Sequence, residues 1–164
     1  MKNYLYVFLI AMLPLIELRG AIPVAYAFNA NDPNFSLILA YILIIISNIV
    51  PIPIIYFFAH KILLWGKNKP VIGKICTVFI EKGEKAGQKL KQKAGKGLFW
   101  ALVLFVGIPL PGTGAWTGAL AASILNINFK QTLLAVSLGV VLAGLIIGAL
   151  CTLGFGAWFG VQAA

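Results

Sequence analysis

The sequence predicts an all-α integral membrane protein made of two inverted repeats. Each repeat is a re-entrant helical hairpin plus one transmembrane helix, and a basic cytoplasmic loop joins the two. Of the 164 residues, 61% are hydrophobic and 10% are charged, with a mean hydropathy of +0.98. Two long stretches carry no charge, and each follows a pair of short apolar segments separated by glycine and proline. This composition is typical of a polytopic membrane protein.

The first hairpin is expected near the N-terminus. Residues 4–16 are apolar, but a helix of that length is only ~20 Å long, against a hydrocarbon thickness of ~30 Å. Gly20 and Pro23 are expected to break the backbone. A helix from residue 4 should therefore end near Leu18, and a second, short helix should begin after Ile22.

The first full crossing is expected over residues 36–59, which follow an Asn-, Asp- and Pro-rich turn at residues 29–34. The stretch has no charged residue and is long enough to span a bilayer. Asn48 places a polar group at its centre, and Pro51 and Pro53 are expected to kink the helix and leave carbonyls without partners.

A basic segment follows. Residues 60–97 hold ten lysines against two glutamates, so the positive-inside rule places this segment in the cytoplasm, next to anionic headgroups. Residues 71–80 are expected to form an interfacial helix, and residues 81–96 a polar helix or flexible segment.

The chain is interpreted as one membrane domain, residues 1–164, divided into repeat 1 (1–60), a basic cytoplasmic linker (61–97), repeat 2 (98–154) and an interfacial tail (155–164).

The second repeat begins with residues 98–106, again too short to span a bilayer. Residues 107–114 contain three glycines and two prolines and are expected to be non-helical. A short helix should cover residues 115–125, and a full crossing should cover residues 132–153. Small residues along that crossing allow another helix backbone to approach closely.

An internal repeat supports this division. An offset of 94 residues aligns Gly20-Ala21 with Gly114-Ala115 and Asn34-Phe35 with Asn128-Phe129. Each half holds a hairpin that returns to its own side plus one crossing, so the halves must insert in opposite orientations. The two hairpin tips should then meet near the midplane, where secondary transporters bind their substrates.

Glu17 and Arg19, the only arginine, are the charged residues of the first hairpin. Charges at membrane depth are costly and usually mark a pathway. Residues two apart do not face each other on a helix, so the two pair only where the backbone is irregular, or each uses another partner. A structural salt bridge is one interpretation. The other assigns Arg19 to an anionic headgroup and Glu17 to proton coupling.

The second hairpin offers the N-terminus of a short helix at Ala115, whose N–H groups attract anions. Hydroxyl groups and an indole ring lie beside it, although tight packing of the tip is an alternative explanation. The candidate residues for substrate binding or coupling are Glu17, Arg19, Gly20, Pro23, Asn48, Pro111, Gly112, Thr113, Gly114, Trp116 and Thr117.

Several other functions are not expected. Cys76 and Cys151 lie far apart, without a CxxC motif or a Cys/His cluster, so no metal site is expected. The glycines of residues 112–114 lack a βαβ context and a P-loop lysine. We therefore expect no enzyme activity, no catalytic residues and no cofactor. The expected partners are membrane lipids and an amphipathic or lipid-phosphate substrate, with a second copy of the chain as a further candidate and no nucleic acid.

Residues 17–23 (ELRGAIP) and 107–118 (GIPLPGTGAWTG) resemble the small multidrug export protein family, and the resemblance covers nearly the whole chain. That family is similar in plan to the DedA (VTT, SNARE-associated) superfamily, whose members have two opposed re-entrant hairpins. They are linked to proton-dependent movement of polyprenyl phosphate or phospholipid headgroups. The resemblance implies a multi-pass transporter in a prokaryotic plasma membrane. This chain departs from the DedA pattern because its second hairpin has no arginine.

Three functional hypotheses follow. The first is a proton-coupled transporter or flippase for an amphipathic, anionic substrate such as a lipid phosphate. The second is an exporter of lipophilic cations, with Glu17 as counter-charge and Trp116 and Tyr26 as an aromatic wall. The third is a non-transporting membrane scaffold that recruits partners through the lysine-rich loop.

Overall fold

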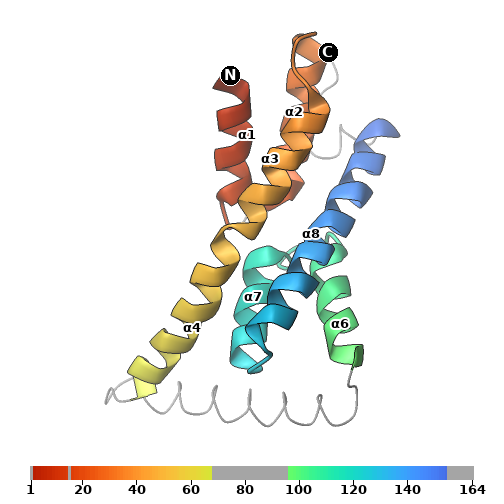
Figure 1. Cartoon of the computed structure of the whole chain (residues 1–164). Coiled ribbons are helices and arrows are strands. Elements are labelled where there is room, and N and C mark those ends of the chain that lie inside the picture. The colour runs from red at the N-terminus through yellow and green to blue at the C-terminus, as the bar shows by residue number, and fades with distance from the viewer. Residues whose placement is uncertain (1, 15, 68–95, 155–164) are drawn as a thin grey trace.

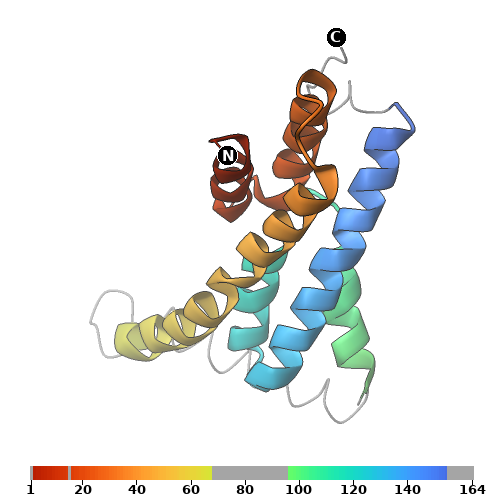
Figure 2. The same cartoon turned by 45° about the horizontal axis from the view of Figure 1, so that its top comes forward.

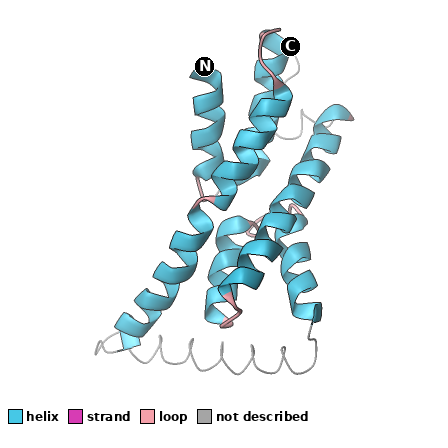
Figure 3. Cartoon of the chain, in the orientation of Figure 1, coloured by secondary structure: helices cyan, strands magenta, loops and turns pink. Residues whose placement is uncertain are grey.

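The computed structural model describes residues 2–14, 16–67 and 96–154, and all regular secondary structure within these ranges is α-helical (Figure 3). The predicted interfacial helix, the polar segment after it, Cys76 and the tail at 155–164 lie outside the described residues. The helices are α1 (Lys2–Met12), α2 (Glu17–Asn31), α3 (Leu37–Ile49), α4 (Pro51–Lys67), α6 (Lys96–Gly107), α7 (Ala115–Ile124) and α8 (Phe129–Thr152).

The helices α1 and α2 form an antiparallel pair whose turn lies near the middle of the molecule (Figures 1 and 2). The predicted position of that turn was wrong. The break lies at Pro14, after the end of α1 at Met12, and α2 already begins at Glu17. A residue that precedes proline is disfavoured in a helix, which explains why α1 ends at Met12. Pro23, expected at the start of the second helix, lies buried inside α2.

The helices α6 and α7 form a second antiparallel pair that starts from the opposite end of the molecule (Figure 1). The loop between them, residues 108–114, is non-helical as predicted. Gly112 has φ +83° and Gly114 has φ +149°, conformations that other residues rarely adopt. The pattern of glycine and proline in this loop therefore located the break correctly.

The predicted first crossing falls on a long helical stretch, Leu37–Ala59, whose two helices α3 and α4 are divided at Val50, next to the prolines. Ser36 caps α3 by accepting a hydrogen bond from Leu39 N at 3.4 Å. One residue, Val50, separates α3 from α4, which begins at Pro51. The helix α4 continues through the first residues of the predicted linker, to Lys67.

The helix α8 is the longest helix in the described part of the chain, with 24 residues. Asn128 caps it by accepting a hydrogen bond from Lys130 N at 2.9 Å, so the helix begins before the predicted residue 132. A Cβ atom at Gly139 would lie 2.6 Å from Val106 Cβ and 2.9 Å from the Val103 carbonyl oxygen. The glycine thus allows α6 and α8 to pack closely, as the small residues predicted.

The surface of these helices is apolar. Leu37–Ala59 and Phe129–Thr152 are long and apolar enough to cross a membrane, judged by length and composition. Large aliphatic and aromatic side chains on both are exposed, for example Ile38, Ile54, Phe58, Leu134 and Leu145. Such an exposed apolar surface is suited to lipid rather than to water.

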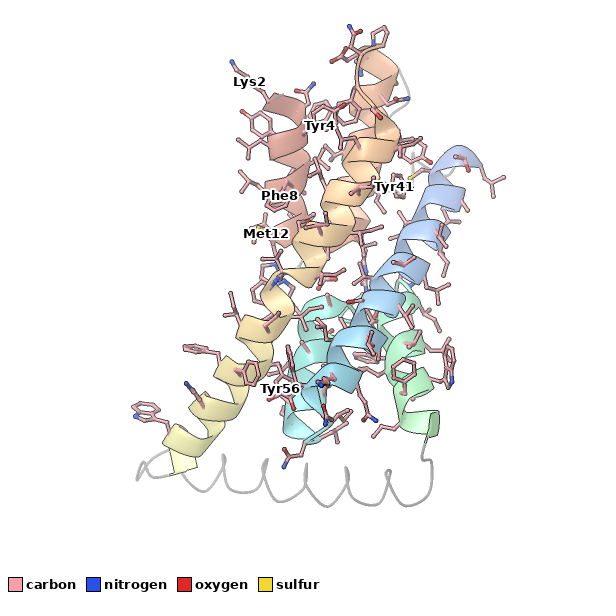
Figure 4. The ribbon with its side chains drawn as sticks, in the orientation of Figure 1. Lys2, Tyr4, Phe8, Met12, Tyr41 and Tyr56 are labelled. Atoms are coloured by element: carbon pink, nitrogen blue, oxygen red, sulfur yellow. The ribbon has the colours of Figure 1, made fainter. Side chains whose placement is uncertain are left out.

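Two tyrosines connect the elements (Figure 4). Tyr56 of α4 donates a hydrogen bond to the Ile127 carbonyl, and Ser123 of α7 donates to the Tyr56 carbonyl at 2.8 Å. The hydroxyl of Tyr41 on α3 lies where a side chain at Gly148 of α8 would be. These contacts hold both halves of the α3–α4 stretch against the other helices. They therefore also help to hold the turns of the two hairpins at the centre of the molecule.

Candidate functional site

The site is the meeting point of the two turns, and its first component is the backbone at Glu17. Ile16 N and Glu17 N both donate to the Leu13 carbonyl, at 3.2 and 2.9 Å, and so form a tight turn after α1. Glu17 has φ +50°, a left-handed conformation that is unfavourable for a residue with a side chain. The turn holds Glu17 as the first residue of α2, with its side chain 4% exposed.

The carboxylate of Glu17 caps the other hairpin. Glu17 Oε1 accepts a hydrogen bond from Trp116 N, in the first turn of α7, at 3.2 Å. The N-cap residue of α7 is Gly114, which has no side chain with which to cap the helix. A Cβ atom at Gly114 would lie 2.6 Å from Glu17 Cδ, so the glycine admits the carboxylate. Because a helix N-terminus carries unpaired N–H groups and partial positive charge, this placement stabilises the carboxylate.

The guanidinium of Arg19 reaches the loop that precedes α7. Arg19 donates to the carbonyl oxygens of Leu110 and Thr113, and Arg19 Nη2 donates to Thr113 Oγ1 at 2.8 Å. Thr113 Oγ1 also lies 2.9 Å from the carbonyl oxygens of Ile108 and Leu110. The guanidinium therefore holds the 108–114 loop through oxygen atoms that carry no formal charge.

The structure bears on the salt bridge that was considered for Glu17 and Arg19. No salt bridge joins the two side chains, both of which are described; each uses a partner on the other hairpin. The interpretation that a salt bridge between Glu17 and Arg19 closes the first hairpin is therefore wrong. This agrees with the spacing of Glu17 and Arg19 in the sequence, because residues two apart on a helix point in different directions.

Two predictions about the tip need correction. Gly20 is helical, and a side chain there would collide with Ile16 Cγ2, so the glycine serves close packing and makes no left-handed turn. The N-terminus of α7, expected to attract an anion, receives the carboxylate of Glu17 from the same chain. An anionic substrate would therefore compete with Glu17 for these N–H groups.

The remaining candidates fall into three groups. Pro111 and Gly112 are exposed on the 108–114 loop, where a Cβ atom at Gly112 would meet nothing within 4 Å. Thr117 Oγ1 donates to the Gly114 carbonyl at 3.3 Å and so belongs to the start of α7. Asn48 is fully buried in α3 and donates to the Ile44 carbonyl, and no contact with Glu17 or Arg19 is present.

Trp116 contributes more than the ring that the sequence suggested. Its backbone N–H binds Glu17, and its indole Nε1 is buried with no hydrogen-bond partner among the described residues. Sequence reasoning also missed the carbonyl of Leu110 as a ligand of Arg19. No signal in the sequence could have found it, because every residue carries a carbonyl group and only the fold selects one.

Within residues 2–14, 16–67 and 96–154, no three His, Cys, Asp or Glu side chains lie close enough to hold a metal ion. The described site offers one carboxylate, one guanidinium, the hydroxyl of Thr113 and the backbone groups around them.

Comparison with protein families gives one match, to the family described as "Putative small multi-drug export protein", over residues 17–146. The match begins at Glu17, just after the first turn, and includes Arg19 and the whole of the 108–114 loop. Comparisons with curated proteins and with solved structures give no match.

Proposed function

This chain belongs to the small multi-drug export protein family, and from that premise we propose that it transports an amphipathic, anionic substrate across a membrane through the meeting point of its two hairpins. It is a membrane protein, as the family and the two long apolar stretches agree. The observation that carries the proposal is the crossed contact at the centre: Glu17 binds the start of α7 while Arg19 binds the loop before it.

The two hairpins are proposed to be re-entrant and related by an inverted repeat. The helices α1 and α6 have 11 and 12 residues, too few to span ~30 Å of hydrocarbon. They enter from opposite ends of the molecule (Figure 1). The residues Arg19 and Thr113 are 94 positions apart, which is the repeat offset in the sequence, and they contact each other. Equivalent residues of a two-fold arrangement touch only near its axis, so this contact supports the axis and the plan of two opposed hairpins.

The orientation is proposed from the positive-inside rule. The end of α4, the start of α6 and the turn between α7 and α8 lie together at one end (Figure 1), and their lysines are Lys61, Lys67, Lys96 and Lys130. The opposite end carries Lys2 and Asp32. The lysine-rich end, with residues 61–97, is then cytoplasmic in the plasma membrane of a prokaryote. In a variant without Cys76 and Cys151, cysteines at Asn34 and Lys130 should react with an impermeant maleimide from opposite sides.

The charge of the substrate is proposed from the different burial of the two charged groups. Arg19 is partly exposed, and its acceptors are carbonyl and hydroxyl oxygens, so its positive charge is not neutralised by a bonded carboxylate. Glu17 is buried and already bound to α7. An entering molecule therefore meets the guanidinium first, which favours a phosphate or carboxylate.

Glu17 is proposed to couple transport to protons. Protonation would remove the charge that the N-terminus of α7 stabilises and so weaken the link between the hairpins. An anionic headgroup could then take the same N–H groups while its charge is held by Arg19. The substrate and the carboxylate would thus alternate at one position.

The test uses proteoliposomes that contain the purified protein and a fluorescent lipid phosphate. Movement of the headgroup between leaflets is measured with and without a pH gradient for wild type, Arg19→Ala and Glu17→Gln. Lys130→Ala is the matched control, because Lys130 is an exposed cation at the membrane end. We expect loss of movement in Arg19→Ala, loss of the pH dependence in Glu17→Gln, and no change in Lys130→Ala. Wild-type movement in both hairpin variants contradicts the proposal.

A second candidate function is export of lipophilic cations. The family description and the buried carboxylate of Glu17 favour it. In that case Glu17 would exchange a proton for the drug. Efflux of tetraphenylphosphonium would then be abolished by Glu17→Gln and survive Arg19→Ala, the reverse of the order expected for an anionic substrate.

The scaffold hypothesis depends on residues 81–96, almost all of which lie outside the described residues, and it stays a prediction. Deleting residues 81–96 should abolish partner recruitment under that hypothesis, whereas Arg19→Ala should not. Self-association, the further partner considered, is tested by the mass of the purified protein in nanodiscs.

A further inference from the structure

The junction between α3 and α4 removes the usual helical donors of two backbone carbonyls. Val50 keeps helical geometry, with φ −53° and ψ −43°, and its N–H donates to the Ile46 carbonyl at 3.0 Å. Pro51 and Pro53 follow and have no N–H. The carbonyls of Ser47 and Ile49 therefore lack the partner that a residue four positions later gives in a helix.

The side chains beside these carbonyls have already used their donors. Ser47 Oγ donates to the Ile44 carbonyl at 2.8 Å, and Asn48 Nδ2 donates to the same oxygen at 2.9 Å. Because the amide nitrogen of Asn48 faces that carbonyl, its Oδ1 points away from it. Asn48 Oδ1 is buried and has no hydrogen-bond partner among the described residues, and the Asn48 side chain is 0% exposed.

At this junction Asn48 Oδ1 is an acceptor without a donor, and the prolines withhold the helical donors of the Ser47 and Ile49 carbonyls. Ser47, Asn48 and Ile52 are each 0% exposed and Pro51 is buried, so these residues face the interior of the molecule. The guanidinium of Arg19 is bound to Leu110 and Thr113. Buried acceptors need a donor or a cation, because an unpaired buried polar group is unfavourable.

We propose that the α3–α4 junction is a binding site for a monovalent cation, with Asn48 Oδ1 and the Ser47 carbonyl among its ligands and the sodium ion as the species it takes. Oxygen ligands suit hard cations. Neutral oxygens without a carboxylate suit a monovalent rather than a divalent ion, and carbonyls at interrupted membrane helices bind such ions in other folds. The site is separate from the Glu17 and Arg19 contacts, so the inference goes beyond the proposed transport function and does not depend on it.

The test measures ion binding without transport. Thermal unfolding of the purified protein in detergent is followed by tryptophan fluorescence as NaCl replaces choline chloride at constant ionic strength. We expect a saturable rise in melting temperature with sodium. In Asn48→Leu the sodium concentration at half-saturation should rise by about tenfold or more, since one ligand is lost. Asn29→Ala, at an exposed position, is the control and should behave as wild type.

A second variant protects the test against misfolding of Asn48→Leu. Pro51→Ala returns an N–H to the Ser47 carbonyl and leaves every polar side chain in place, so sodium should bind more weakly while the helix remains intact. Either of two results overturns the proposal. One is a melting temperature of the wild type that responds equally to sodium and to choline. The other is an undiminished sodium response in both Asn48→Leu and Pro51→Ala. Neither result bears on headgroup movement in proteoliposomes, so failure here and failure of the transport proposal are distinguishable.

Discussion

Arg19 Nη2 donates to Thr113 Oγ1 at 2.8 Å, which joins two residues separated by 94 positions in the chain. Arg19 follows the turn between α1 and α2, and Thr113 lies just before α7. The contact therefore links the two hairpins at their tips. Its neighbour, the contact of Glu17 with Trp116 N, crosses in the same direction from the first hairpin to the second. The stability of the two hairpin tips should therefore depend on both residues of each contact.

Thr113→Val should destabilise the protein by about 1 kcal/mol, because it removes the hydroxyl that accepts from Arg19 and keeps the volume of the side chain. The carbonyl of Thr113 still binds Arg19, so the loss is partial. Thr152→Val is the matched control, since its hydroxyl donates only to Ala149 within the last turn of α8. Equal melting temperatures of the two variants in detergent would contradict the assigned link.

Gly114→Ala should destabilise the protein by about 2–4 kcal/mol, since it adds a Cβ to a backbone with φ +149° and into the carboxylate of Glu17. Gly112→Ala has an unfavourable φ of +83° but meets nothing within 4 Å, so it should cost only about 1 kcal/mol. Unfolding in a denaturing detergent compares the two. Adding Glu17→Ala to Gly114→Ala should recover part of the loss, and a purely additive double variant would show that the carboxylate is not there.

Glu17→Gly should be more stable than Glu17→Ala by about 1 kcal/mol, although glycine normally destabilises helices. Both variants lose the cap on α7, but only alanine keeps the cost of the left-handed backbone at φ +50°. Ala21, which is buried one turn further along α2, is the control position. There the change from alanine to glycine should destabilise the protein by about 1 kcal/mol, the opposite of the effect expected at position 17. Thermal unfolding of the three variants measures the difference, and Glu17→Ala as the more stable member of the first pair would contradict it.

Gly139→Ala should separate α6 from α8 and destabilise the protein by about 1–3 kcal/mol, because its Cβ would lie 2.6 Å from Val106 Cβ. Gly144→Ala lies on the same helix with only Ile22 Cδ1 nearby, at 3.9 Å. It should be neutral or stabilising by up to ~1 kcal/mol, because alanine favours the helix. Melting temperatures in the reverse order would show that the α6–α8 contact is misplaced.

The order of the elements was predictable because it follows from local composition. The charge-free stretches gave the two long helical segments, and the glycines and prolines of residues 107–114 gave the second break. The first break lies at Pro14 and not at the predicted Gly20 and Pro23, both of which are inside α2. Proline is tolerated inside α2, and Gly20 is small because Ile16 lies against it.

The sequence by itself determined the class of protein, the pairing of short and long helical segments, and the two charged residues of the first hairpin, since apolar runs and the cost of a charge in lipid are properties of the chain. Only the tertiary structure decided that Glu17 and Arg19 bind the second hairpin and not each other. Their partners are backbone groups of Trp116, Leu110 and Thr113. Every residue has such groups, and only the packing of two distant turns brings these particular ones within hydrogen-bonding distance.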